Sequence, residues 1–307
     1  MSKQLEKILV IRPGALGDTL MLLPSMCALT PKHKIWVAGR RPGIEFLSPY
    51  AEQCFDMEQG QWHTLFLRSR GGQALPPRGV EVVVCFITDR DCTISLNLRY
   101  CYPGARVYVF PSLPCGGDRV HVAQHVAMCL SIAGLALEPE AVLRVAREKP
   151  LLDECQCHPR NYIVLHPGSG SKRKNYSEAF WSRLINIISQ LPAASTLRPL
   201  ILLGPAEAEI WPRLASKLRF RGLHVVVSAS SRDLLKIMRK ARIFIGHDSG
   251  ITHLAAMAGA NTMAMFKASD PVLWRPLGPK VTVIKGAKNE DFLMGQVLDW
   301  LVSCQGA

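Results

Sequence analysis

The chain alternates short apolar, β-branched segments with longer amphipathic segments over its whole length, and this pattern most restricts its possible folds. Segments 8–12 and 162–166 are too short for core helices and consist mainly of Val, Ile and Leu, as buried parallel strands do. Segment 121–135 is longer and places its apolar residues on one helical face. The alternation predicts an α/β protein built from parallel βα units, not a sandwich or a helix bundle.

The succession of strands and helices repeats twice along the chain. In the first half we expect a helix at 121–135 and strands at 8–12, 34–38, 80–87 and 105–110. In the second half we expect strands at 162–166, 199–203, 223–227, 243–245, 262–266 and 280–284, and helices near 177–191, 206–219, 231–241, 250–258 and 289–303.

Between the two halves lies a polar segment, 137–160, which holds three prolines and is the best linker candidate. We therefore expect two doubly wound, Rossmann-like domains, 1–158 and 159–307, that face each other. In this arrangement the last helix can also pack back on the first domain. Ligands in such folds bind at the carboxyl ends of the strands, so we expect the functional residues in the loops that follow strands.

Composition is compatible with two such domains but leaves the binding partner open. The 307 residues are 48% hydrophobic and 20% charged, which excludes a disordered or fibrous chain. Lys and Arg (37) exceed Asp and Glu (24), and the formal net charge of +13 favours phosphorylated substrates, nucleic acid or an anionic membrane surface. The sequence offers no compact basic helix and no recognised nucleic-acid-binding motif, so we do not expect nucleic acid to be the partner.

Cysteine usage and hydropathy indicate a cytoplasmic protein. The ten cysteines follow no regular spacing, and several lie in apolar runs, as reduced, buried thiols do. We find no signal-peptide pattern and no apolar segment of membrane-spanning length, so we expect at most peripheral contact with a membrane. The cluster Cys155-Gln156-Cys157-His158 lacks the second ligand pair of a closed zinc site, and we expect no bound metal.

The first strand runs into a loop with two glycines and then into a helix. Gly14 and Gly17 lack the third glycine of the dinucleotide fingerprint, and no Lys-Ser or Lys-Thr pair follows, so neither the Rossmann nor the P-loop rule is met. Asp18 follows this loop and has two possible roles. It can be the N-cap of the helix, which the local sequence favours, or a general base for an incoming hydroxyl. Pro24 is expected to kink or restart the helix.

A loop of small residues and then three consecutive cations follow the strand at 162–166. The small residues, with Gly168 and Ser169 among them, let a ligand approach the backbone closely. The cations at 172–174 suit a phosphate or diphosphate, although a solvated basic loop is the usual alternative. We favour the phosphate site because the cations follow a strand end, where this fold binds ligands.

A later strand ends near 245 and passes through a tight turn into a helix. The N–H groups of residues 250–252 are expected to point out of the helix start, where anions bind well. Asp248 would repel a phosphate, so we assign it to sugar or ribose hydroxyls or to helix capping. His253 lies in the first turn, where it either contacts the ligand or is satisfied within the helix.

One more carboxylate, Glu207, comes shortly after the expected strand at 199–203. Its side chain can bind ribose hydroxyls, or it can place negative charge in the first turn of the following helix. It completes a set of polar groups that follow strands in both halves of the chain.

Four segments resemble the glycosyltransferase family 9 heptosyltransferases in order and spacing, across nearly the whole chain. They are Ile-Arg-Pro-Gly-Ala-Leu-Gly-Asp (11–18), His-Pro-Gly-Ser-Gly-Ser-Lys-Arg-Lys-Asn-Tyr (166–176), Phe-Ile-Gly-His-Asp-Ser-Gly-Ile-Thr-His-Leu-Ala-Ala (244–256) and Ser-Asp-Pro-Val-Leu-Trp-Arg-Pro-Leu-Gly (269–278). The resemblance implies a GT-B fold, in which the first of two facing Rossmann-like domains binds most of the acceptor and the second binds the nucleotide sugar.

The resemblance also implies roles for individual positions. Asp18 matches the family's proposed general base, and Lys174 matches the lysine that contacts the donor diphosphate. Glu207 matches a ribose-binding acid. The donor-binding turn is matched by Asp248, Ser249, Gly250 and Thr252. The expected donor-binding residues are Gly17, Gly168, Ser169, Lys172, Glu207, Asp248, Ser249, Gly250, Ile251, Thr252 and His253.

The implied reaction is inverting transfer of a sugar, heptose from ADP-heptose in the first instance, to a hydroxyl of a lipopolysaccharide-core or related acidic glycan or glycolipid. The nucleotide sugar is a substrate, and no tightly bound cofactor or metal is expected, because fixed cations, with Arg173 as a further candidate, can stabilise the leaving diphosphate. Peripheral contact with the inner membrane face would suit such an acceptor. Open alternatives are another nucleotide sugar on the same fold, a nucleotide-sugar epimerase or hydrolase, and a non-catalytic basic binding protein.

Two places in the chain depart from the usual family pattern. Lys267-Ala268 brings a cation beside the expected donor pocket, and His247 stands where a smaller residue or Asn is more usual. For the acceptor the sequence offers arginines that can meet acidic groups or simply be solvated. These are Arg68, Arg70, Arg90 and Arg99.

Overall fold

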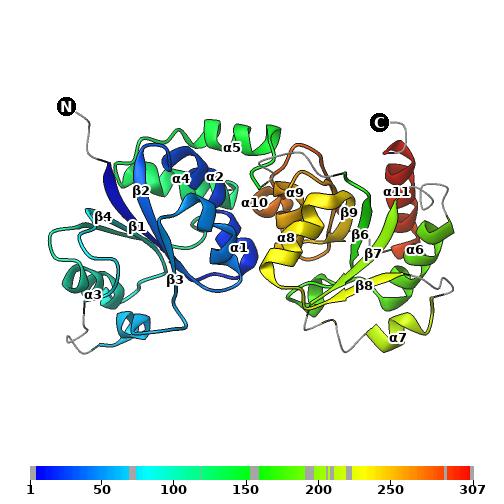
Figure 1. Cartoon of the computed structure of the whole chain (residues 1–307), viewed down its shortest axis with the longest axis horizontal. Coiled ribbons are helices and arrows are strands. Elements are labelled where there is room, and N and C mark those ends of the chain that lie inside the picture. Colours follow the sequence, from blue (N-terminus) through cyan, green and yellow to red (C-terminus); the bar gives the residue numbers. More distant parts are fainter. Residues whose placement is uncertain are drawn as a thin grey trace. The chain divides into compact units, whose positions relative to one another are not determined.

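The computed structural model describes residues 5–68, 74–117, 119–152, 159–190, 197–204, 207, 211–218, 223–286 and 289–304. The chain divides into two compact units, unit 1 (Met1–Val145) and unit 2 (Ala146–Ala307). Each unit is an α/β domain with its own parallel sheet, as Figure 1 shows.

Unit 1 contains a five-stranded sheet in the order β3-β2-β1-β4-β5, in which every neighbouring pair is parallel. Its strands are β1 (Glu6–Arg12), β2 (His33–Gly39), β3 (Gln53–Asp56), β4 (Val82–Phe86) and β5 (Arg106–Phe110). Its helices are α1 (Leu16–Leu20), α2 (Leu23–Leu29), α3 (Thr93–Cys101), α4 (Val122–Ile132) and α5 (Pro139–Glu148), with 3-10 helices η1 (Gly43–Phe46), η2 (Ser48–Tyr50) and η3 (Trp62–Phe66). The central strands are buried on both faces, which explains their continuous apolar sequences.

Unit 2 contains a six-stranded parallel sheet in the order β11-β10-β9-β6-β7-β8. Its strands are β6 (Tyr162–His166), β7 (Arg198–Leu203), β8 (His224–Val227), β9 (Ala241–His247), β10 (Asn261–Phe266) and β11 (Val281–Lys285). Its helices are η4 (Lys172–Lys174), α6 (Glu178–Gln190), α7 (Trp211–Ala215), α8 (Ser231–Lys240), α9 (Gly250–Met257), α10 (Pro271–Trp274) and α11 (Glu290–Ser303).

Both sheets have the strand order of a doubly wound fold. The order reverses between β1 and β4 in unit 1 and between β6 and β9 in unit 2. Ligands of such folds bind at the carboxyl ends of the strands at this switch point. The segment after β1 leads to Asp18, and the segments after β6 and β9 are the expected phosphate loop and the turn at 248–250. The topology therefore brings the predicted motif loops to the ligand-binding position of each sheet.

The last helix, α11, belongs to the core of unit 2. Its residues Leu293, Val297 and Leu301 follow one another at four-residue intervals and lie in the same buried cluster as Phe180 and Trp181 of α6. The apolar face of α11 is thus used within its own unit.

Every strand expected from the sequence is present within a few residues of its expected bounds. In unit 1 the strand β3, the helices α3 and α5 and the three 3-10 helices were not anticipated. Pro24 lies in the first turn of α2, which begins three residues after α1 ends, so the proline restarts the helix as expected. Of the helix expected at 206–219, the described part is α7.

The expected linker was wrong in one respect, because its first part is the helix α5. Val142, Leu143 and Ala146 are buried on one side of this helix, and Pro139 occupies its first position, where a proline is tolerated. The two compact units divide inside α5, between residues 145 and 146, rather than at the expected 158. Residues 153–158 lie outside the described part of the chain.

Candidate active site

The loop between β6 and α6 folds around the side chain of Ser169. This side chain is buried, and its hydroxyl lies 2.6 Å from Asn175 Oδ1 and 2.8 Å from the carbonyl oxygen of Ser171. The contacts close the loop into a compact turn whose last part is η4, the helical turn that carries the three cations. Lys172 and Arg173 are exposed, so their charged groups are open to solvent. The loop thus presents a dense positive charge at the carboxyl end of β6.

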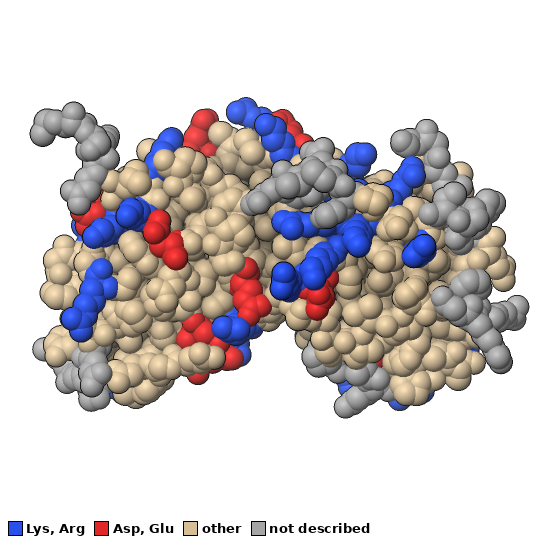
Figure 2. All heavy atoms as spheres, in the orientation of Figure 1, with Lys and Arg blue, Asp and Glu red and all other residues tan. Residues whose placement is uncertain are grey.

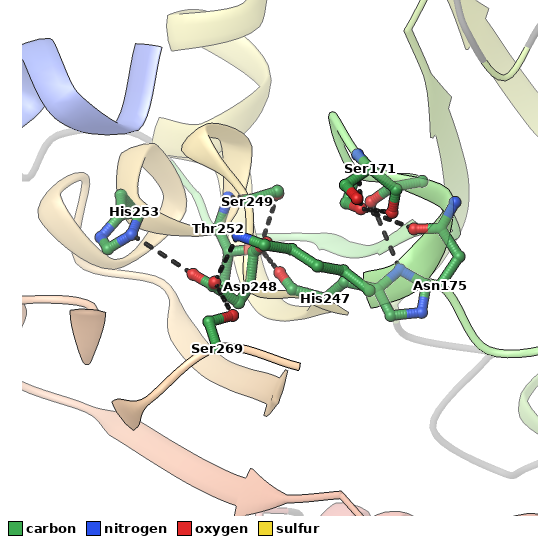
Figure 3. A network of polar contacts seen from close by, with 11 residues as sticks. Ser171, Asn175, His247, Asp248, Ser249, Thr252, His253 and Ser269 are labelled. Carbon is green, nitrogen blue, oxygen red and sulfur yellow. Dashed lines mark hydrogen bonds and ion pairs between the residues drawn. The ribbon is translucent and has the colours of Figure 1, made fainter. Parts of the chain in front are cut away.

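The third cation, Lys174, is held by a carboxylate from the neighbouring strand. Its Nζ lies 2.7 Å from Oδ2 of Asp248, which directly follows β9. Ser269, from the loop after β10, donates to the same carboxylate oxygen, and His253 Nε2 lies 3.7 Å from Oδ1. Figure 3 shows His253 and Ser269 pointing at Asp248 from opposite sides. Three loops that are distant in sequence therefore meet at one carboxylate.

The carboxylate of Asp248 stays ionised although it is only 3% exposed. Burial raises its pKa, but hydrogen bonds from His253, Lys174 and Ser269 outweigh burial and hold the pKa at about 2. The ionised, buried Asp248 fixes the ammonium of Lys174, which remains 33% exposed. The exposed member of this pair is therefore the Lys174 ammonium, at the carboxyl end of the sheet.

The N-cap of α9 is Ser249, whose hydroxyl accepts a hydrogen bond from the N–H of Thr252 at 3.4 Å. The alternative role of Asp248 as a helix cap is therefore wrong. The Thr252 hydroxyl also donates to the carbonyl oxygen of His247, which ties the start of the helix to β9. Because the N–H of Thr252 is used by the cap, the N–H groups of Gly250 and Ile251 are the ones at the open helix start.

Glu207 lies beside the loop between β6 and α6, with 5% of its surface exposed. Its Oε2 accepts a hydrogen bond from the N–H of Gly204 at 2.9 Å. Gly168 packs directly against this side chain, since a Cβ atom at Gly168 would lie 2.0 Å from Glu207 Cδ. Gly168, which was predicted to let a ligand approach the backbone, therefore also leaves room for the Glu207 carboxyl group. Residues 205–206 and 208–210 on either side lie outside the described part of the chain.

Asp18 in unit 1 occupies the third position of α1 and is not its N-cap. Its Oδ2 accepts a hydrogen bond from the N–H of Ala15, the N-cap residue, at 3.2 Å. Arg12, which is 1% exposed, donates through Nε to the Asp18 carbonyl oxygen at 2.8 Å and places Nη2 4.0 Å from Oδ1. Burial lowers the pKa of Arg12 to about 10, so the guanidinium stays charged at neutral pH. The Asp18 side chain is 31% exposed.

The predicted site residues fall into two groups. Gly17 and Asp18 lie in α1 of unit 1, and all the others lie at the carboxyl ends of β6, β7 and β9 in unit 2. Ser269 was not singled out from the sequence, although its contact with Asp248 makes it part of the network. Its position directly before Asp270-Pro271 was the only available signal. Of the candidate acceptor arginines, Arg68 pairs with Asp91 at 3.6 Å, and Arg70 lies outside the described part.

Basic side chains also gather on the helix α8, which is distinct from the loop between β6 and α6. α8 carries four of them, and its apolar residues Leu234 and Met238 are buried. Figure 2 shows a group of basic side chains on the face of unit 2 where α8 lies in Figure 1. The expectation that no compact basic helix is present is therefore wrong. Part of the net charge of +13 lies on this surface.

Within the described residues, no group of three or more His, Cys, Asp or Glu side chains is placed to hold a metal ion. The cluster at 155–158 lies outside this part of the chain. The eight cysteines that are described are free thiols, and Cys92 and Cys115 among them are exposed rather than buried. No helix among the described residues is long and apolar enough to cross a membrane.

Two Rossmann-like parallel sheets with polar loops at their carboxyl ends are the architecture of the GT-B fold. Solved structures share this fold over almost the whole chain. They include Escherichia coli heptosyltransferase WaaC with ADP (16% identity, TM-score 0.70, 97% of this chain and 99% of that chain) and E. coli ADP-heptose LPS heptosyltransferase II (17%, 0.67, 97% and 98%). A third is a glycosyltransferase family 9 protein from Veillonella parvula (13%, 0.66, 97% and 92%).

The family is established by sequence. A model of glycosyltransferase family 9 (heptosyltransferase) matches residues 117–296, which is more than half of the chain. The chain therefore belongs to glycosyltransferase family 9 and is a glycosyltransferase. A search of curated proteins found no sequence match.

Proposed function

We propose that this protein is an inverting glycosyltransferase that moves heptose from ADP-heptose to a hydroxyl of a lipopolysaccharide-core or related acidic glycan. In this proposal unit 2 binds the nucleotide sugar and unit 1 binds the acceptor. The observation that carries the proposal is the fixed Lys174–Asp248 pair at the switch point of unit 2. E. coli WaaC, which has the same fold, was solved with ADP and with ADP-2-deoxy-2-fluoro heptose.

The donor diphosphate is assigned to the loop that carries the three cations. As the sugar leaves, negative charge grows on the diphosphate, and a cation fixed in advance stabilises that charge without reorganisation. Lys174 is suited to this task because Asp248 fixes its position. The exposed Lys172 and Arg173 and the N–H groups at the start of α9 add positive potential. No metal is needed for the departure of this leaving group in the proposed mechanism.

The nucleoside is assigned to the neighbouring strand end. Glu207 uses Oε2 to accept from Gly204, which leaves Oε1 to accept from a ribose hydroxyl. Burial lowers the pKa of His166 at the end of β6, and its Nδ1–H donates to the carbonyl oxygen of Leu202 at 2.9 Å. His166 is therefore neutral, and its ring is held in one orientation near the Glu207 side chain.

Asp18 is assigned as the general base. Its carboxylate is partly exposed on a short helix anchored by the buried Arg12, which keeps it in one place. In the proposed step, Asp18 removes the proton from the acceptor hydroxyl while that oxygen attacks the anomeric carbon and the diphosphate leaves. The acceptor hydroxyl gives up its proton, the new glycosidic bond forms, and the configuration at the anomeric carbon inverts.

Peripheral contact with the inner membrane face is part of the proposal, and one surface of unit 1 suits it. Asn97 of α3 donates to the carbonyl oxygens of Leu65 and Leu67 at 3.0 and 2.8 Å, which fastens η3 to α3. Around this junction four apolar side chains are between 46% and 59% exposed, and Arg68 is 88% exposed. They are Phe66, Leu67, Leu96 and Tyr100. Exposed apolar groups of this kind suit contact with the surface of a bilayer.

The donor assignment is tested by thermal-shift titration with ADP-heptose, UDP-sugars and GDP-sugars, since a ligand that binds the folded state raises its stability with occupancy. ADP-heptose should give the largest shift, and a larger shift with a UDP- or GDP-sugar contradicts the assignment. Donor turnover without any acceptor would indicate an epimerase or hydrolase instead. Salt-sensitive nucleic-acid binding without donor binding would indicate a non-catalytic role, with α8 as the first surface to examine.

A further inference from the structure

Both ends of the phosphate loop are bonded to one buried side chain, that of His247 at the end of β9. Its Nε2 accepts a hydrogen bond from the backbone N–H of Tyr176 at 2.9 Å. Its Nδ1–H donates to the carbonyl oxygen of Gly168 at 3.3 Å. Gly168 lies near the start of the loop and Tyr176 near its end. A single imidazole therefore joins two backbone groups that are eight positions apart in the sequence.

The imidazole is neutral and fixed in one orientation. Burial lowers the pKa of His247 to about 3, so the ring carries no charge at physiological pH. Because a backbone N–H can only donate, Nε2 must be the acceptor, and the single ring proton must be on Nδ1. The ring of Tyr176 stacks on the imidazole with centroids 5.6 Å apart, and the ring of Trp181 stands at 75° to it with centroids 5.2 Å apart. These rings leave the imidazole little freedom to rotate.

Lys267 holds the same loop from its outer side. Its Nζ donates to the carbonyl oxygen of Asn175 at 2.8 Å and lies 5.1 Å from the ring centroid of Tyr176. The cation that the sequence places beside the donor pocket is therefore directed at the backbone of the loop. Lys267 follows β10 and His247 ends β9. Residues at the ends of two neighbouring strands therefore hold the loop that follows a third strand, β6.

We propose that His247 and Lys267 are positioning residues that hold the loop 168–176 in its anion-binding conformation before the donor arrives. The inference rests on the proposed function, because it takes this loop as the diphosphate site. A loop that is ordered in the free protein does not lose that conformational freedom on binding, so more of its interaction energy appears as affinity. The loop carries Lys174, whose position determines how well the leaving diphosphate is stabilised.

Substitutions at His247 can remove the two hydrogen bonds separately. His247→Phe keeps a planar ring and loses both bonds. In His247→Asn the amide nitrogen lies near the former Nδ1 and can still donate to Gly168, whereas in His247→Gln the amide oxygen can reach the former Nε2 position and accept from Tyr176. Lys267→Met removes the outer contact at an exposed position. Ile185→Val, a small change in the buried core of unit 2, controls for a general loss of stability.

The first measurement is native-state cleavage by trypsin after Lys172, Arg173 and Lys174, mapped by mass spectrometry. It does not depend on any donor. Cleavage at these sites should be about 10-fold faster in His247→Phe, intermediate in the Asn, Gln and Lys267→Met variants, and unchanged in Ile185→Val, because cleavage follows the population of the open loop. Equal cleavage rates in the wild type and all loop variants would overturn the proposal, as would equal acceleration in Ile185→Val.

The second measurement compares the affinities of ADP and adenosine by calorimetry. His247→Phe should weaken ADP by about 10-fold, equivalent to about 1.4 kcal/mol, and leave adenosine unchanged, and the Asn and Gln variants should recover part of the loss. Equal weakening of both ligands would mean that the substitution damages the unit as a whole and would overturn the proposal. A wild type that binds no ADP would refute the donor assignment alone, while the trypsin series still tests the loop. If His247→Phe does not fold, Lys267→Met and the two amide variants provide the same comparisons.

Discussion

Units 1 and 2 each place an aspartate beside a cation at the switch point of the sheet, but they bury opposite members of the pair. In unit 1 the cation is buried, with Arg12 1% and Asp18 31% exposed and 4.0 Å between their nearest charged atoms. In unit 2 the carboxylate is buried, with Asp248 3% and Lys174 33% exposed at 2.7 Å. The buried member fixes the other and leaves it available to a ligand. Unit 1 therefore offers a carboxylate that can accept a proton, and unit 2 offers an ammonium that can bind an anion.

The largest expected effect comes from removing the exposed carboxylate of unit 1. Asp18→Asn should lower kcat by about 10³-fold, because general-base catalysis contributes about 10²- to 10⁴-fold, and should leave ADP affinity unchanged. Steady-state kinetics together with ADP calorimetry check both parts. Full activity in this variant would sink the assignment of Asp18 as the base. The thermal midpoint serves as the control for folding.

Removing the exposed cation of unit 2 should have the next largest effect. Lys174→Met should lower kcat/KM by about 10²-fold, because it removes a fixed charge that acts on the leaving diphosphate. Unlike Asp18→Asn, it should also weaken ADP. Calorimetry and steady-state kinetics distinguish the two patterns. Identical patterns in the two variants would mean that the units do not have the separate roles proposed for them.

The buried carboxylate of unit 2 should reveal itself in acid. The pKa of Asp248 is lowered from 3.8 to about 2, so its contribution to the free energy of unfolding is complete above about pH 4 and is lost as the pH falls toward about 2. That contribution is about 2 kcal/mol. Urea unfolding at a series of pH values should show the wild type losing this amount relative to Asp248→Asn.

The exposed Asp291 is the matched control for this acid series, because its side chain is 71% exposed and pairs with the exposed Arg183. Asp291→Asn should follow the wild-type pH dependence closely, since exposed ion pairs contribute little. If Asp248→Asn also followed the wild-type curve, the hydrogen bonds to Asp248 would not be holding its pKa down.

The smallest effect is expected at the exposed cation two residues before Lys174. Lys172→Met should raise the donor KM only a few-fold, because its charge is solvated and its interaction with the diphosphate is screened by salt. Raising the salt concentration should reduce the difference between the wild type and Lys172→Met more than the difference between the wild type and Lys174→Met. Equal effects of the two lysines would show that the bond to Asp248 gives Lys174 no advantage.

The strands and the site loops could be predicted from the sequence because both follow from local patterns. Buried parallel strands are continuous apolar runs, and the segments that follow them lie at one edge of the sheet. The edge strand β3 was missed because its four residues, Gln53–Asp56, are only partly buried and show no apolar run. The helix α5 was missed because the three prolines and the charged residues of the segment 137–160 hid the short apolar face of Val142, Leu143 and Ala146.

The contacts within the site could not be predicted, because they join loops that are distant in sequence. Nothing in the segment 247–253 indicates that Asp248 bonds to Lys174 and Ser269, or that Ser249 rather than Asp248 caps the helix. These choices depend on which carboxylate oxygen faces which neighbouring strand end. The strand order of the sheet determines which strand ends are neighbours, and no single segment of the sequence encodes that order.

Two glycines, Gly14 and Gly168, carry a consequence for mutational scanning of this enzyme. A Cβ atom at Gly14 would lie 2.3 Å from Asp18 Cβ, and one at Gly168 would lie 2.0 Å from Glu207 Cδ. Even alanine at either position would displace the carboxylate beside it. In a library that samples every position, these two glycines should therefore be as intolerant of substitution as the acids they adjoin, although neither has a side chain that could take part in the reaction.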